Sequence, residues 1–199
     1  MPRPRTQMVD PRVTSYYHCI SRCVRRAFLC GLDPLSGNSF DHRKQWIATR
    51  IKELVAIFAI DVCSYGLMSN HFHLILRIVA QRAHTWSEQE VAERYEKLFP
   101  KAVAHARLVP PDRWRSIVSI WRERLTSLSW FMRALNESIA RQANHEDNVT
   151  GRFWEGRFRS QALLDVGALL TCMAYVDLNP LRAGIASDLE SRASRRRLR

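Results

Sequence analysis

The chain has 199 residues, enough for one domain with a sizeable core, and its 31 Lys and Arg against 19 Asp and Glu give a net charge of +12. A positive field of this strength favours a polyanionic partner, with nucleic acid as the first expectation and an anionic membrane surface as the second. The longest apolar run covers only residues 54–60, and five cysteines in a chain of this size suit reduced thiols, so we expect no membrane span and a cytoplasmic, bacterial-type location.

Hydrophobic periodicity and turn residues divide the first part of the chain into alternating strands and helices. Residues 1–14 are basic and rich in proline, lack the apolar stretch of a secretory signal, and are expected to form a loose arm. The next predicted elements are a strand over 15–22, a helix over about 41–59 that Asp41 caps, and a hairpin of two strands over 61–68 and 71–79.

Residues 80–112 are predicted to form a helical insertion after this hairpin. Ser87 and Glu90 have the spacing of a capping box, which indicates a short helix to about Leu98 that Pro100 ends. A long helix with one apolar stripe is then expected over about 113–143, with a break near Ser127.

The last predicted elements are a fourth strand and a final helix. The strand covers 153–164, where aromatic residues alternate with charged ones, and Asp165 caps the helix that follows. The helix is expected to end at Asn179, because a residue before proline is disfavoured in the helical conformation. The Arg-rich tail over 186–199 is expected to become ordered only on an anion.

The order β-α-β-β-α-β with a further helix predicts an α+β fold of the ferredoxin-like, split βαβ type. It consists of an antiparallel sheet with helices on one face and a C-terminal helix. In this arrangement the first and third strands lie side by side at the centre of the sheet.

The third predicted strand carries two histidines on one face. Because side chains alternate along a strand, His71, His73 and Ile75 point one way, and the residues between them form an ordinary core face. Two neutral imidazoles about 6.6 Å apart along a strand can hold one divalent cation. The alternative is a pair of polar residues on the solvated face of a half-buried strand.

Three stretches, 70–73, 153–158 and 175–184, together resemble the single-tyrosine transposases of the HUH (His-hydrophobe-His) endonuclease group. The resemblance is closest to the transposases associated with repetitive extragenic palindromes (REP), and it marks about residues 15–185 as the transposase domain. It implies DNA transposition or recombination through metal-dependent cleavage and rejoining of single-stranded DNA with a hairpin. It also implies that Tyr175 is the nucleophile, that His71 and His73 bind Mg²⁺ or Mn²⁺, and that Asn179 completes the metal shell.

The residues alone leave several of these roles open. Tyr175 could be a buried helix aromatic, and Asn179 could be a C-cap before Pro180. Five arginines could line a DNA path or belong to the plain surface: Arg22, Arg25, Arg26, Arg157 and Arg159. Trp154 and Phe158 could stack on bases but suit core packing better.

Three further residues near the predicted site receive no catalytic role from the sequence. Asp177 and Glu155 could be extra metal ligands, although solvated charges are the better interpretation. His18 is expected to be a core or sheet-surface histidine rather than a ligand.

Two other functions fit the same sequence. A non-catalytic nucleic-acid-binding protein can use this class of fold, and a metal-dependent hydrolase would use the two histidines to activate water. A monomer and a homodimer are equally compatible with the sequence.

Overall fold

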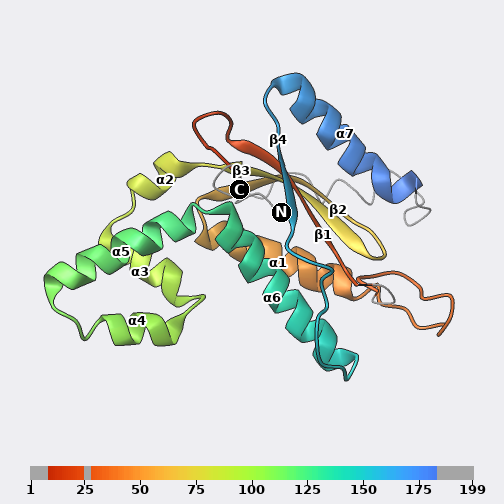
Figure 1. The fold of residues 1–199 in the computed structure, drawn as a ribbon, viewed down its shortest axis with the longest axis horizontal. Helices are drawn as coiled ribbons and strands as arrows, with labels where there is room; N and C mark the ends of the chain where they lie inside the picture. Colours follow the sequence, from red (N-terminus) through yellow and green to blue (C-terminus); the bar gives the residue numbers. More distant parts are fainter. Residues whose placement is uncertain (1–8, 25–27, 183–199) are drawn as a thin grey trace.

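Four antiparallel strands form a sheet at the centre of the protein (Figure 1). The computed structural model describes residues 9–24 and 28–182. The strands are β1 (Tyr16–Arg22), β2 (Ile60–Leu67), β3 (His71–Ile78) and β4 (Arg159–Ala162). Their order is β2-β3-β1-β4, which is the order of the ferredoxin-like fold, and it confirms that the first and third strands are neighbours at the centre.

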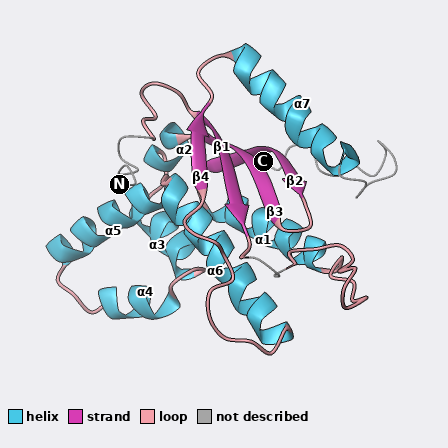
Figure 2. Ribbon diagram, turned by 45° about the vertical axis from the view of Figure 1, so that its right-hand side comes forward, coloured by secondary structure: helices cyan, strands magenta, loops and turns pink. Residues whose placement is uncertain are grey.

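Helices cover both faces of this sheet (Figure 2). The helices are α1 (Arg43–Ile57), α2 (Ala80–His84), α3 (Glu88–Glu96), α4 (Pro100–Ala106), α5 (Pro111–Leu125), α6 (Leu128–Glu146) and α7 (Val166–Arg182). Helices α1 and α6 lie together on one face, and α7 lies alone on the other. Among the described residues no helix is long and apolar enough to cross a membrane.

The main core lies between the sheet and the pair α1 and α6. Phe72, Leu74 and Leu76 of β3 point into it and are fully buried, as the alternation along the strand predicts. The helices contribute their apolar stripes: Ile47, Ile51 and Leu54 from α1, and Phe131, Leu135 and Ile139 from α6. The predicted break near Ser127 is confirmed, because α5 ends at Leu125 and α6 begins at Leu128.

Helices α2 to α5 form a helical lobe beside α6. The predicted capping box is present: Ser87 Oγ accepts from the Glu90 amide at 3.1 Å, and Glu90 Oε2 accepts from the Ser87 amide at 2.7 Å. Tyr95 stacks on Trp121 with ring centroids 4.7 Å apart, which joins α3 to α5. The sequence missed α4, because Pro100 begins a helix at its first turn instead of only ending the one before.

Three predicted boundaries are wrong. Asp41 does not cap α1, because its carboxylate pairs with Lys44 Nζ at 2.8 Å and the helix begins at Arg43 without a side-chain cap. The fourth strand is restricted to four residues, since the preceding segment turns at Gly156. The last helix continues through Pro180 to Arg182, so the helix does not end at Asn179 as predicted.

The two ends of the chain fall partly outside the described residues. The predicted arm is described from residue 9 onward, and there Thr14 Oγ1 donates to the Leu163 carbonyl at 2.6 Å. The predicted tail over 186–199 lies wholly outside, so the proposed domain limits stay predictions. All five cysteines are described, and the structure holds no disulfide among them.

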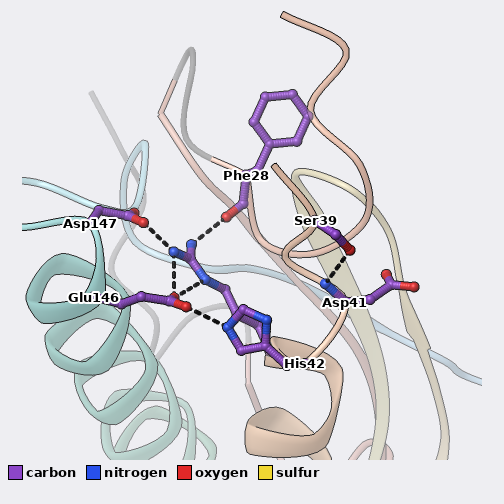
Figure 3. A network of polar contacts seen from close by, with 7 residues as sticks. Phe28, Ser39, Asp41, His42, Glu146 and Asp147 are labelled. Atoms are coloured by element: carbon purple, nitrogen blue, oxygen red, sulfur yellow. Dashed lines mark hydrogen bonds and ion pairs between the residues drawn. The ribbon is translucent and has the colours of Figure 1, made fainter. Parts of the chain in front are cut away.

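A buried arginine ties the start of α1 to the end of α6 (Figure 3). Arg43 is fully buried, and its Nε donates to Glu146 Oε2 at 2.6 Å while a second nitrogen bonds Asp147. Its Nη1 donates to the Phe28 carbonyl at 2.7 Å. The guanidinium group therefore has both charge and hydrogen-bond partners, which a buried cation requires.

We expect Arg43→Ala to lower the free energy of unfolding by about 3 kcal/mol, because the substitution leaves two partly buried carboxylates without their cation. Chemical denaturation followed by circular dichroism measures this difference. Lys52→Ala, an exposed position on the same helix, is the matched control and should change stability by less than about 0.5 kcal/mol. Equal effects of the two substitutions would show that the buried network is not stabilising.

Candidate functional site

The two histidines of β3 lie on the face of the sheet that α7 covers. His73 is almost fully buried, with 3% of its surface exposed, and His71 is partly buried. Their ring centroids are 4.9 Å apart. The pair therefore faces away from the main core, on the side that the strand alternation predicts.

Each of these two imidazoles uses its Nδ1 atom for a polar contact with the protein, and the Nε2 atom of His73 also lies near Asn179 of α7. His71 Nδ1 lies 2.7 Å from Asn70 Oδ1, which fixes Nδ1 as the donor and leaves the lone pair on Nε2. His73 Nδ1 lies 2.9 Å from His18 Nε2, and its Nε2 lies 3.3 Å from Asn179 Nδ2. One nitrogen anchored and the other directed into the site is the pattern that metal-binding histidines show.

Burial keeps these side chains neutral. Burial, followed by the neighbouring His18 and His71, lowers the pKa of His73 to about 4. The pKa of His71 is also lowered, mainly by burial and then by the charge of Arg22. At neutral pH both rings therefore keep the lone pairs that a cation needs.

Helix α7 begins at the cap that the sequence predicts and lies close against β2. The Ala168 amide donates to Asp165 Oδ1 at 2.7 Å, which satisfies a free donor of the first turn. Further along, a Cβ at Gly66 would lie only 2.9 Å from the carbonyl oxygen of Val176. Glycine is therefore required there for the helix backbone to approach the strand.

A side-chain hydrogen bond and a small apolar cluster also hold α7 against the sheet. Ser64 Oγ donates to Asp177 Oδ1 at 2.8 Å, so this carboxylate is directed at β2. Val176 is fully buried and packs with Ile75 and Leu163, in a cluster separate from the main core. These contacts set the rotation of the helix about its axis.

This rotation brings Tyr175 and Asn179 to the histidine pair. The ring centroid of Tyr175 is 5.7 Å from that of His73, with the rings nearly perpendicular. Tyr175 is 45% exposed, so it is not the buried helix aromatic that was the alternative. Asn179 lies one turn further on the same face and is not a C-cap, because the helix continues beyond it.

An open pocket of about 420 Å³ lies beside the histidine pair. His71 and His73 form part of its wall, and the other lining residues are Ile20, Arg22, Glu155, Gly156, Arg157 and Arg159. Three of the five predicted DNA-binding arginines thus lie together at the candidate site. The other two, Arg25 and Arg26, fall outside the described residues.

The remaining residues named from the sequence have other surroundings. Trp154 and Phe158 are buried in the main core, and Trp154 Nε1 donates to the Asn136 carbonyl at 2.9 Å, so core packing is confirmed for both. Glu155 lines the pocket. His18 is the residue whose contact the sequence missed. Its place opposite Ile75 on the central pair of strands is the signal that could have indicated it.

In residues 9–24 and 28–182 no three His, Cys, Asp or Glu side chains converge to hold a metal ion. A metal at this site would therefore depend on the two imidazoles together with an oxygen ligand of another kind. The Asn179 side chain is the described group that faces His73 Nε2.

The protein thus combines a ferredoxin-like sheet, a pair of histidines on a central strand, and a helix that places a tyrosine beside them. No family model matches the sequence, and no curated protein matches it. The solved structure of a REP-associated tyrosine transposase bound to a REP hairpin is similar, with a TM-score of 0.52. The alignment covers 94% of this chain and 76% of that chain at 12% identity, so it shows a shared fold.

We expect Gly66→Ala to loosen α7, because the new Cβ would press on the Val176 carbonyl. Overpacking of this kind costs about 1–3 kcal/mol, which corresponds to about 5- to 150-fold faster exchange of the α7 amides. Hydrogen exchange followed by mass spectrometry measures the rates. Gly156→Ala, where a Cβ meets no atom within 4 Å, is the control, and indistinguishable exchange in the two variants would refute this role of Gly66.

Proposed function

We propose that the protein is a transposase-type enzyme that cleaves and rejoins single-stranded DNA through a covalent bond to Tyr175. The observation that carries the proposal is the meeting of His71, His73, Tyr175 and Asn179 from a central strand and a helix that lie far apart in the sequence. A structural neighbour that is itself a transposase bound to a DNA hairpin supports it. The proposed biological setting is DNA transposition or recombination, with single-stranded DNA next to a hairpin as substrate.

The residues present fit a divalent cation. His71 and His73 would bind it through Nε2, since their Nδ1 atoms already have partners. Asn179 would add an oxygen, because rotation of its amide group exchanges Oδ1 with the nitrogen that now faces His73. Mg²⁺ and Mn²⁺ suit a site with oxygen ligands and open positions, and either would stabilise the negative charge that develops on the scissile phosphate.

The nucleophile is the phenolic oxygen of Tyr175. It forms a bond to phosphorus while the bond from phosphorus to the 3′-oxygen breaks, and the phenol loses a proton while the 3′-oxygen gains one. The products are a 5′-phosphotyrosine and a free 3′-hydroxyl. One phosphodiester replaces another, so the reverse reaction rejoins DNA without ATP.

The arginines of the pocket would hold the DNA strand. Arg22, Arg157 and Arg159 are exposed and line the same pocket as His71 and His73. Guanidinium groups bind phosphate oxygens through paired hydrogen bonds, which both attract and align the backbone. Alignment matters because the phenolic oxygen must approach phosphorus to about 3–3.5 Å.

We expect Tyr175→Phe to abolish cleavage and the covalent adduct but to leave DNA binding intact, because only one oxygen is removed from a half-exposed ring. A labelled single-stranded oligonucleotide with Mg²⁺ and denaturing electrophoresis measures the adduct. In the wild type, peptide mapping should locate the nucleotide between Met173 and Arg182.

Tyr16→Phe is the matched control, because Tyr16 packs against the same small cluster as α7. It should form the adduct at the wild-type rate. An adduct in Tyr175→Phe, or one mapped to another tyrosine, would exclude the proposed nucleophile. Cleavage without any adduct would favour a hydrolase, and binding without cleavage a non-catalytic nucleic-acid-binding protein.

We expect EDTA, His71→Ala and His73→Ala each to stop cleavage, because each removes the cation or one of its ligands. Binding measured by fluorescence anisotropy should persist, because the arginines are unchanged. His105→Ala, a substitution at an exposed histidine of α4, should cleave normally. Near-normal cleavage by the His71 and His73 variants would make the two imidazoles structural.

A further inference from the structure

His18 occupies the centre of the sheet, directly beside the proposed metal ligands. It lies on β1 opposite Ile75 of β3, so its side chain shares the face of His71 and His73. Only 8% of its surface is exposed. A neutral buried imidazole needs a partner for its polar nitrogens.

The partner is the ring of His73. The two rings lie edge to edge in nearly one plane, with centroids 5.1 Å apart and planes 18° from parallel, and His18 Nε2 lies 2.9 Å from His73 Nδ1. At that separation no metal ion fits between the two nitrogens. His18 is therefore not a third ligand through Nε2, although it touches one of the proposed ligands.

A hydrogen bond between two neutral imidazoles couples their tautomers, because one nitrogen must donate and the other accept. If His73 Nδ1 donates, His73 Nε2 keeps a lone pair. If His18 Nε2 donates, His73 Nε2 carries the proton and cannot bind a cation. Asn179 distinguishes the two arrangements, since its amide nitrogen, a donor, faces His73 Nε2 at 3.3 Å.

We infer that His18 is a positioning residue that holds His73 in the tautomer with the proton on Nδ1. The in-plane contact with His18 also fixes the plane of the His73 imidazole, so that its bare Nε2 is directed toward Asn179. This inference rests on the proposed function insofar as His73 binds a metal ion. The tautomer itself is a property of the metal-free protein.

The test compares two substitutions at position 18. His18→Phe keeps a flat ring of similar size but has no acceptor for the His73 Nδ1 proton. His18→Gln supplies an amide oxygen that can accept it. The matched control is His105→Phe, at an exposed position on α4 far from the sheet in the fold.

Two measurements compare these variants: the tautomer of His73 and the affinity for Mn²⁺. Long-range ¹H–¹⁵N correlation spectra of the EDTA-treated protein report which nitrogen of His73 carries the proton. Titration with Mn²⁺ followed by electron paramagnetic resonance reports metal affinity, for which loss of a partner of this kind costs about 10- to 100-fold. Thermal unfolding confirms that each variant is folded.

We expect the wild type to show His73 protonated on Nδ1, and His18→Phe to lose this preference together with about 10- to 100-fold in Mn²⁺ affinity. His18→Gln should restore part of both, and His105→Phe should match the wild type. An unchanged His73 tautomer with unchanged Mn²⁺ affinity in His18→Phe would overturn the inference. If His18→Phe does not fold, His18→Gln is required to keep part of the tautomer preference and of the Mn²⁺ affinity, and complete loss of the preference in this variant would overturn the inference.

The two proposals fail in different ways. A wild type that binds no Mn²⁺ but whose His73 tautomer depends on His18 would refute the metal site and leave the positioning role in place. A wild type that binds Mn²⁺ with His73 protonated on Nε2 in the free protein would refute the positioning role alone.

Discussion

The antiparallel pairing of β1 with β3 is the constraint on which the candidate site depends. Its register sets His18 opposite Ile75, Ile20 opposite His73 and Arg22 opposite His71. Paired residues share a face of the sheet. Strand β3 therefore supplies the imidazoles of His71 and His73, while β1 supplies the His18 ring and the positively charged Arg22 side chain to the same face. A shift by one residue would turn these side chains into the main core.

The second requirement is a helix held flat against that face. Backbone contact at Gly66 and the hydrogen bond between Ser64 and Asp177 orient α7 so that Tyr175 and Asn179 face the sheet. Neither of these two contacts involves the residues proposed to do chemistry. The helix that carries Tyr175 is therefore placed by small and polar residues of β2, and the Tyr175 side chain remains half exposed.

Much of the fold follows from local sequence patterns. The alternation along β3, the capping box at Ser87 and the cap at Asp165 are local, and the structure bears out all three. Two contacts that the sequence missed join distant segments. Arg43 meets Glu146, 103 residues away, and His18 meets His73, 55 residues away, and no periodicity reports such pairs. The fourth strand is shorter than predicted because bends at residues 155–157 separate the bridge between Cys23 and Trp154 from β4.

The interior contains two apolar clusters, and the two parts of the candidate site, the histidines of β3 and the α7 residues Tyr175 and Asn179, are attached to different ones. The strand β3 is shared with the large core, whereas α7 is held by a cluster whose fully buried members are few. Regions with few buried contacts open at lower free energy than the core to which they are attached. The histidines thus belong to the most persistent part of the fold, while the tyrosine belongs to a unit that can open by itself, leaving the strands paired and the imidazoles in place.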